Sequence, residues 1–171
     1  MCKEMFFIHK KNIIVKDGLQ MKDLIIKNLQ DIKPITITNY EGKNTFTAKP
    51  IIPWEDVSTC SAAFIEVPVG KRSYVNHWHN ISEEIFYIIS GKGKLRTFYG
   101  EKEVTAGDII CFPVGEKGVH AIANASDTEP LIYIDFATNP KTDIAIEPDT
   151  NQVAIYSEHI PTMTLDMPKQ K

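Results

Sequence analysis

The amino-acid sequence predicts an all-β protein, either a sandwich or a barrel. Between residues 61 and 137 it contains about eight short runs of β-branched and aromatic residues, spaced about ten residues apart. Turns that contain glycine or proline separate these runs, and no run has a persuasive helical periodicity. A chain of 171 residues with 43% hydrophobic and 24% charged residues has the composition of one ordinary globular domain.

Residues 1–59 are expected to form an N-terminal extension and an extended arm that packs on the domain. The first part has no clear pattern, and Met21 is a candidate for the start codon that is used. Residues 24–26 fit either a short strand or a helical turn, which Pro34 ends in both cases. Residues 35–56 combine β-branched residues with turn residues and prolines, which is typical of an extended arm with short edge strands.

A central domain is predicted over residues 60–137. Its strands are expected at residues 63–67, 73–79, 84–90, 94–99, 102–105, 109–112, 119–124 and 131–137. The glycines of residues 91–93 predict a hairpin turn. Residues 138–171 are predicted to form a C-terminal tail, in which residues 153–156 add an edge strand and residues 163–171 are mobile.

Composition and charge argue against several classes of function. The net charge of -3 and the lack of a basic face argue against nucleic-acid binding. No segment approaches the roughly 18 consecutive apolar residues of a membrane-spanning helix, and the N-terminus lacks the features of a signal peptide. The three cysteines form no CxxC pair and suit a reducing compartment, so a cytoplasmic protein is expected. Cys111 lies in an apolar run and is expected to be a small buried residue.

Three of the five histidines lie in the predicted strands and form a candidate metal site. Side chains at positions i and i+2 of a strand share a face, so His77 and His79 point the same way. Glu84 begins the next apolar run, and His120 begins a third. Two imidazoles in register, with a third imidazole and a carboxylate from neighbouring strands, suit one transition-metal ion. The alternative is an ordinary polar strand face, but unpaired polar groups at buried positions are costly.

Several nearby residues each have two interpretations. Asn124 shares a face with His120 and either supports a ligand through a hydrogen bond or ends a strand. Tyr133 either offers its hydroxyl group to the site or packs in the core. Lys94 and Arg96 either bind a carboxylate or are simply solvated.

The histidines stand in two motifs that resemble those of the cupin superfamily. The first cupin motif runs from a glycine through His-x-His and a glutamate to a second glycine. Here it comprises Gly70, His77, His79, Glu84 and Gly91. Glu83 also fits the gap after the histidines, but only Glu84 leaves six residues before Gly91. Glu84 is therefore the preferred ligand.

The second cupin motif runs from a glycine through Pro-x-Gly and a histidine to an asparagine. Here it comprises Gly107, Pro113, Gly115, His120 and Asn124. With both motifs in order, the chain resembles small stand-alone bacterial proteins that have a single cupin domain. The resemblance implies a double-stranded β-helix, or jelly-roll barrel, with an N-terminal arm. It also implies a homodimer, for which the arm at residues 35–56 is the candidate contact.

The resemblance further implies that His77, His79, Glu84 and His120 hold one divalent transition metal ion, which is iron, manganese, zinc or nickel. The predicted function is a metal-dependent enzyme that acts on a small polar molecule, of the dioxygenase, isomerase or decarboxylase and lyase type. A non-catalytic module that binds or senses a small molecule is the alternative. No catalytic residue and no organic cofactor is predicted. The motif pair occurs once, which argues against a two-domain oxalate decarboxylase arrangement.

Overall fold

The computed structural model describes residues 24–39, 42–52, 59–158 and 160–168. In this part of the chain the regular elements are strands and 3-10 turns, with no α-helix. The strands are β1 (Ile35–Asn39), β2 (Asn44–Pro50), β3 (Cys60–Val67), β4 (Trp78–His79), β5 (Glu84–Ser90), β6 (Lys92–Thr97), β7 (Gly100–Thr105), β8 (Ile109–Phe112), β9 (His120–Asn124), β10 (Leu131–Thr138), β11 (Thr142–Glu147), β12 (Gln152–Ser157) and β13 (Met163–Asp166). The 3-10 turns η1 (Leu29–Asp31) and η4 (Glu116–Gly118) accompany them. The predicted all-β class is confirmed.

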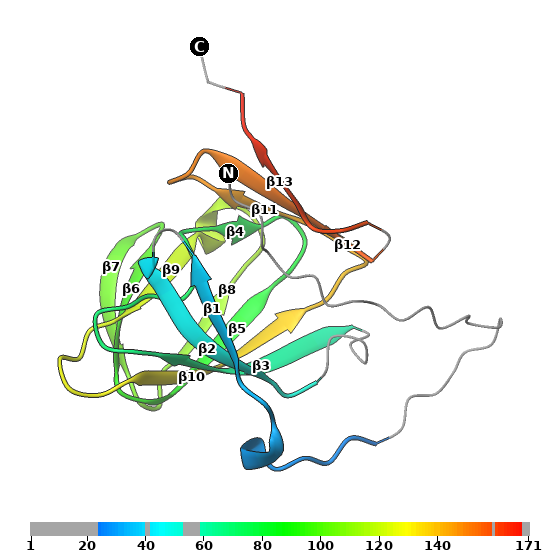
Figure 1. Ribbon diagram of the computed structural model, residues 1–171. Coiled ribbons are helices and arrows are strands. Elements are labelled where there is room, and N and C mark those ends of the chain that lie inside the picture. Colours follow the sequence, from blue (N-terminus) through cyan, green and yellow to red (C-terminus); the bar gives the residue numbers. More distant parts are fainter. Residues whose placement is uncertain (1–23, 40–41, 53–58, 159, 169–171) are drawn as a thin grey trace.

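The strands form three sheets that together build a jelly-roll barrel (Figure 1). The six-stranded sheet has the order β1-β2-β3-β10-β5-β8, and the three-stranded sheet has the order β7-β6-β9. The four-stranded sheet, β13-β12-β11-β4, lies across one end of the barrel in Figure 1. The central pairs β3–β10 and β10–β5 are antiparallel, although their strands lie far apart in the sequence.

The hydrophobic core lies inside the barrel and receives side chains from two sheets. Phe86 and Tyr133 come from the six-stranded sheet, whereas Leu95 and Ile122 come from the three-stranded sheet. Alternate residues of β5 are buried and exposed, since successive side chains of a strand point to opposite faces. Every second side chain of β5 therefore points into the interior of the barrel.

The N-terminal arm joins the barrel as two extra strands. β1 pairs with β2, and β2 pairs with β3, both antiparallel. Phe46 of β2 is fully buried in the core, so the arm contributes to the interior as well as to the edge of the sheet. Residues 24–26 form neither of the two elements considered for them. Met21 lies outside the described residues.

The hairpin predicted at residues 91–93 is wrong. β5 pairs with β10 and β8, whereas β6 pairs with β7 and β9, so Gly91 leads the chain from one sheet to another. Gly91 has φ = 80°, and a Cβ atom there would lie 2.4 Å from the carbonyl oxygen of Pro130. A turn sequence predicts a bend, but it does not decide which strands become partners.

The strand predicted at residues 73–79 is also shorter than expected. Only Trp78 and His79 form β4. The preceding residues follow β9 through single contacts, in which the N–H groups of Ser73 and His77 donate to the carbonyl oxygens of Ile122 and His120.

Three further predictions need correction. Residues 153–156 lie in β12, which is an interior strand between β11 and β13. Residues 163–166 form β13, which pairs with β12, so this part of the predicted mobile end is ordered in a sheet. Cys111 is exposed, because it lies on the outer face of β8 while Phe112 points inward.

No helix among the described residues is long and apolar enough to cross a membrane.

Candidate metal centre

The four residues predicted as metal ligands lie on adjoining parts of the barrel. His79 lies in β4 with His77 just before it, Glu84 begins β5, and His120 begins β9. His77 and His120 face each other across an antiparallel bridge. The N–H group of each donates to the carbonyl oxygen of the other, at 3.0 and 2.9 Å. Backbone pairing therefore fixes the separation of these two histidines.

The three imidazole side chains converge on one carboxylate oxygen, Oε2 of Glu84. It lies 3.3 Å from Nε2 of His120, 3.7 Å from Nε2 of His79 and 3.8 Å from Nε2 of His77. The ligand atoms of His77, His79 and Glu84 all lie within 4.8 Å of one another. The structure thus holds a His-His-Glu group that could bind a metal ion, and it places His120 beside this group.

Each histidine ring is oriented by a hydrogen bond at its other nitrogen. Nδ1 of His77 lies 2.9 Å from the carbonyl oxygen of Val75, and Nδ1 of His120 lies 2.9 Å from that of Gly118. Since a carbonyl oxygen only accepts, Nδ1 must carry the proton in both rings. The unprotonated Nε2 atoms could then donate their electron pairs to a cation that lies between them and the Glu84 carboxylate, as metal ligands do.

The third histidine is held by a carboxylate that the sequence analysis missed. Nδ1 of His79 donates to Oδ2 of Asp143 at 2.7 Å. Asp143 also accepts backbone N–H groups from Ile81 at 2.9 Å and from Ser82 at 3.3 Å. Such a carboxylate fixes the ring of a metal-binding histidine and increases its basicity. The sequence of β11 offers no signal for this role, because its alternating isoleucines, Ile144 and Ile146, lie on the face opposite Asp143 and Ala145.

Two ligand atoms of the site are buried without a hydrogen bond. They are Oε2 of Glu84 and Nε2 of His120, and His120 as a whole is only 2% exposed. Buried polar atoms without partners are costly and rare in folded proteins. A cation between them would satisfy both, so the residues present suit a metal ion.

Burial also sets the protonation of the site. Burial lowers the pKa of His120 to about 4, with a smaller contribution from the neighbouring His77, and burial lowers the pKa of His77 as well. Burial alone would lower the pKa of His79, but the hydrogen bond to Asp143 and the charge of Glu84 raise it above its usual value. His77 and His120 are therefore neutral at pH 7, the form that binds metals.

Aromatic rings surround the histidines. The ring of Phe112 stacks on His120 with centroids 3.7 Å apart, and Phe86 meets the same imidazole edge-on at 5.4 Å. Tyr74 lies 6.0 Å from His77, and Tyr156 lies 6.3 Å from His79. The phenylalanines come from the barrel interior, so an apolar wall closes the inner side of the site.

Asn124 and Tyr133, considered above as helpers of the site, are engaged elsewhere. The amide nitrogen of Asn124 donates to the carbonyl oxygens of Val67 and Glu129 at 3.0 and 2.8 Å, so this residue holds the turn after β9. The hydroxyl group of Tyr133 donates to Oγ of Ser73 at 3.0 Å, and the residue is fully buried in the core.

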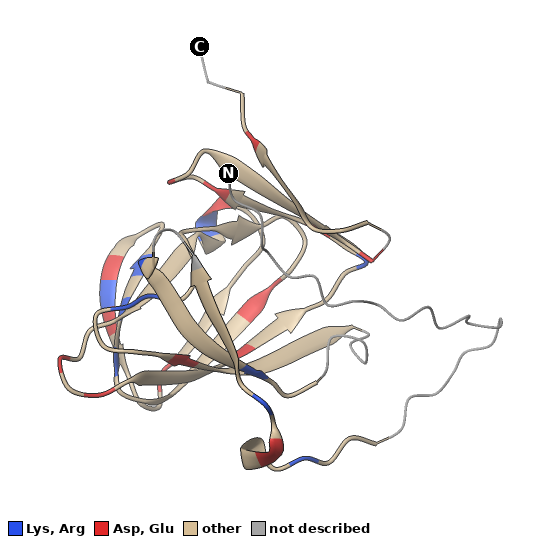
Figure 2. Cartoon of the chain, in the orientation of Figure 1, with Lys and Arg blue, Asp and Glu red and all other residues tan. Residues whose placement is uncertain are grey.

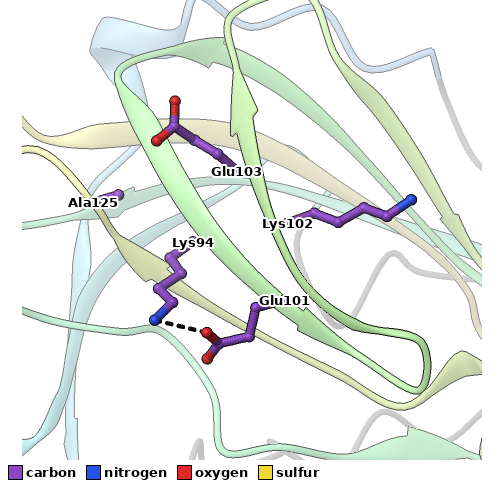
Figure 3. Close-up of a pocket in the computed structure, with 5 residues that line it drawn as sticks. All are labelled: Lys94, Glu101, Lys102, Glu103 and Ala125. Carbon is purple, nitrogen blue, oxygen red and sulfur yellow. Dashed lines mark ion pairs between the residues drawn. The ribbon is translucent and has the colours of Figure 1, made fainter.

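Lys94 and Arg96 form ion pairs on the outside of the barrel. Lys94 pairs with Glu101 at 2.8 Å, and Arg96 pairs with Asp149 at 2.6 Å. Figure 3 shows the Lys94 pair in a shallow surface pocket of about 250 Å³, which is also lined by Lys102, Glu103 and Ala125. Because Leu95 between the two basic residues points into the core, this pocket lies on the face of the sheet opposite the metal centre.

Comparison with known proteins matches the family model described as "Cupin domain" to residues 63–137. The chain is 34% identical over 115 residues to an uncharacterised protein of Methanocaldococcus jannaschii, and the match covers 67% of this chain and 69% of that protein. It is 38% identical over 105 residues to a probable oxalate decarboxylase of Arthroderma benhamiae, a match to 58% of this chain. That match spans only 23% of the length of the oxalate decarboxylase.

Among solved structures, the fold is similar to that of a sugar phosphate isomerase from Silicibacter pomeroyi. The TM-score is 0.72 at 19% sequence identity, and the match covers 81% of this chain and 90% of the isomerase. At this level of identity the likeness concerns the fold.

Proposed function

Because the chain belongs to the cupin family, we propose that it is a metal-dependent enzyme that acts on a small polar molecule. The observation that carries the proposal is the convergence of three imidazole Nε2 atoms on Oε2 of Glu84, with two of these four atoms buried and unpaired. A merely structural polar cluster would pair its buried atoms internally.

We propose His77, His79, Glu84 and His120 as the metal ligands. Three neutral imidazoles and one carboxylate suit a divalent iron, manganese, zinc or nickel ion. When bound, such an ion acts as a Lewis acid, an electron carrier or a template for the substrate. The chain's own residues fix the donor atoms, since Val75, Gly118 and Asp143 hold the three Nδ1 positions.

The number of donors favours a working site over a structural one. Four protein ligands on a six-coordinate ion leave about two positions for water or substrate. Two similar proteins carry the names of enzymes with small polar substrates, an oxalate decarboxylase and a sugar phosphate isomerase. These names support an enzyme of the decarboxylase or isomerase type, with a dioxygenase as a further possibility for an iron-loaded protein.

Elemental analysis of protein purified without an affinity tag or chelator tests this proposal. We expect one transition metal ion per chain, bound by the wild type and lost from His120→Ala. Asn124→Ala is the matched control, because Asn124 is a buried polar residue of the same strand that holds a turn instead. A wild type that binds no metal even after reconstitution would overturn the proposal of a metal-dependent enzyme. It would favour the alternative, a non-catalytic module that binds a small molecule. Binding of a small molecule without turnover would also favour that module.

We also propose that the protein forms a homodimer through its arm. β1 is the last strand of the six-stranded sheet, and in the described part of the chain it pairs only with β2. An unpaired strand edge is a common place for pairing with a second chain. Light scattering should therefore give twice the mass of one chain, and a monomer at micromolar concentration would contradict this assignment.

A further inference from the structure

A second cavity, of about 450 Å³, lies where the start of β2 meets the end of β9. Its lining includes three basic residues, Lys43, Lys71 and Arg72, together with the last two residues of β9, Ala123 and Asn124. Cavities of this volume commonly hold small molecules. The metal centre lies at the first end of β9, about 10–13 Å away along the strand. The second cavity is therefore separate from that centre.

Backbone hydrogen bonds hold the segment that carries Lys71 and Arg72. The N–H group of Asn124 donates to the carbonyl oxygen of Lys71 at 2.9 Å, and that of Thr45 donates to the carbonyl oxygen of Arg72 at 3.0 Å. The segment thus lies between β9 and β2, and Figure 2 shows basic positions in blue beside the start of β2. The ammonium group of Lys71 donates to the carbonyl oxygen of Gly42 at 2.8 Å. The chain's own hydrogen bonds therefore hold this cation at the wall of the cavity.

The three basic side chains of the cavity lack counter-charges. Among the described residues, no carboxylate forms an ion pair with Lys43, Lys71 or Arg72, and the last two are partly buried. On the outside of the barrel, Lys94 and Arg96 are 58% and 51% exposed, and each pairs with a carboxylate. Water compensates a cation less well as its burial increases, so the partly buried pair needs an anion more than the exposed one does.

Asn44 adds a buried hydrogen-bond donor beside these cations. Its side chain is fully buried, and its Oδ1 atom accepts a hydrogen bond from Nε of Arg72. Because Nε of an arginine only donates, the atom that faces it must be the amide oxygen, which leaves Nδ2 as the donor. Nδ2 is buried and has no hydrogen-bond partner among the described residues. Buried donors without partners are rare, and this one lies next to a guanidinium group, so the missing acceptor is expected to carry negative charge.

We propose that this cavity binds a phosphate group, either as inorganic phosphate or as the phosphate monoester of a small molecule. Such a group offers at least three acceptor oxygens and nearly two negative charges. The terminal nitrogens of Arg72 form a fork that matches two of these oxygens, whereas Lys43 and Lys71 supply ammonium groups. A monocarboxylate has only two oxygens and one charge for the same donors. The proposal does not depend on the metal centre.

Isothermal titration calorimetry with inorganic phosphate and with glycerol 3-phosphate, at one ionic strength, tests the proposal. We expect the wild type to bind both probes, and Arg72→Gln to bind them about tenfold more weakly or worse, because a charged bidentate contact is lost. Arg96→Gln is the matched control, since Arg96 is an exposed arginine already paired with Asp149, and it should bind as the wild type does. Tighter binding of glycerol 3-phosphate identifies a monoester as the ligand, and equal affinity identifies inorganic phosphate.

Two more variants keep the test decisive if Arg72→Gln does not fold. Asn44→Asp puts a carboxylate of the same shape beside Arg72, so we expect it to lose phosphate binding and to raise the thermal midpoint in phosphate-free buffer. Lys43→Gln changes an exposed residue and should weaken binding while the thermal midpoint stays the same. If both variants bind phosphate as tightly as the wild type, the assignment of the site is wrong.

Three results would overturn the proposal. The first is a wild type that binds neither probe at millimolar concentration. The second is phosphate binding that disappears in His120→Ala, because the anion would then lie at the metal centre, a result that leaves the proposed function standing. The third concerns Glu41, which lies outside the described residues. Phosphate binding that is seen only in Glu41→Gln would show that the chain's own carboxylate takes the place of the ligand.

Discussion

The two ends of β5 differ in what they bury on the same face of the strand, because one end buries a polar group and the other an apolar side chain. Glu84, at the first end, places a buried carboxylate oxygen without a hydrogen bond among three imidazoles. Ile88, four residues later on the same face, is fully buried in the apolar core with Leu131 and Val67. We name the first region, His77, His79, Glu84 and His120, the metal end, and the second, Val67, Ile88 and Leu131, the core end.

The difference shows how one barrel separates function from stability. The core end gains free energy from every apolar side chain it buries. The metal end lowers the stability of the metal-free protein, because it buries polar atoms that have no hydrogen-bond partner. A substitution at one end should therefore change stability without changing metal affinity, and a substitution at the other end should do the reverse.

The largest expected effect concerns the metal end. His79→Ala removes one of four proposed ligands, and we expect metal affinity to fall by more than about 100-fold, beyond the usual effect of a residue that only supports a ligand. The barrel should still fold, since His79 lies on the two-residue strand β4. Competition with a chelator measures the affinity. A variant with full stoichiometry and unchanged affinity would rule out His79 as a ligand.

The matching substitution at the core end is Ile88→Ala. Removing this buried side chain should lower the free energy of unfolding by about 2–5 kcal/mol. Urea unfolding of the metal-free protein measures the loss, and metal affinity of the folded variant should remain that of the wild type. A metal affinity that falls in parallel with stability would contradict the separation of the two ends.

A change of pH should change stability through the histidines of the metal end. The pKa of His120 is about 4 in the folded protein and about 6.5 in an unfolded chain, so the unfolded chain binds more protons between these values. Stability of the metal-free protein therefore falls as the pH drops from about 6.5 to about 4, by up to roughly 3 kcal/mol for His120. His77 acts in the same direction, because burial lowers its pKa too, whereas His79, whose pKa is raised, acts in the opposite direction.

Thermal unfolding across this pH range checks the prediction. His120→Phe removes the titrating group while it keeps an aromatic ring beside Phe112, so its pH dependence should be smaller than that of the wild type. An equal pH dependence in the two proteins would show that the destabilisation arises elsewhere.

The smallest effect is expected for the residue that orients His79. Asp143→Asn keeps the shape of the side chain but weakens the hydrogen bond to Nδ1, and we expect a loss of about 10–100-fold in metal affinity. The backbone N–H groups of Ile81 and Ile144 donate to Oδ1, which asparagine keeps, so the side chain should stay in position and the overall fold should persist. Asp149→Asn, an exposed member of an ion pair with Arg96, is the control and should leave metal affinity unchanged.

The sequence predicts the metal end better than the strand pairing around it. The alternation of side chains along a strand and the two motifs were enough to predict His77, His79, Glu84 and His120 as ligands. These four residues lie within one short part of the chain. Asp143 was missed, since it lies 64 residues after His79 in the sequence and reaches it only because β11 pairs with β4. The hairpin at Gly91 failed for the same reason. The alternation of polar and apolar residues predicts which face of a strand a side chain occupies. Which strands pair depends on how the whole barrel closes.

X-ray absorption spectroscopy of the metal-loaded wild type tests the central claim most directly. The account predicts a metal ion bound by three imidazole nitrogens and oxygen ligands, and the loss of one imidazole contribution in His120→Ala. A spectrum with fewer than three imidazoles in the wild type, or one that His120→Ala leaves unchanged, would contradict the assignment of the four residues to a single metal centre.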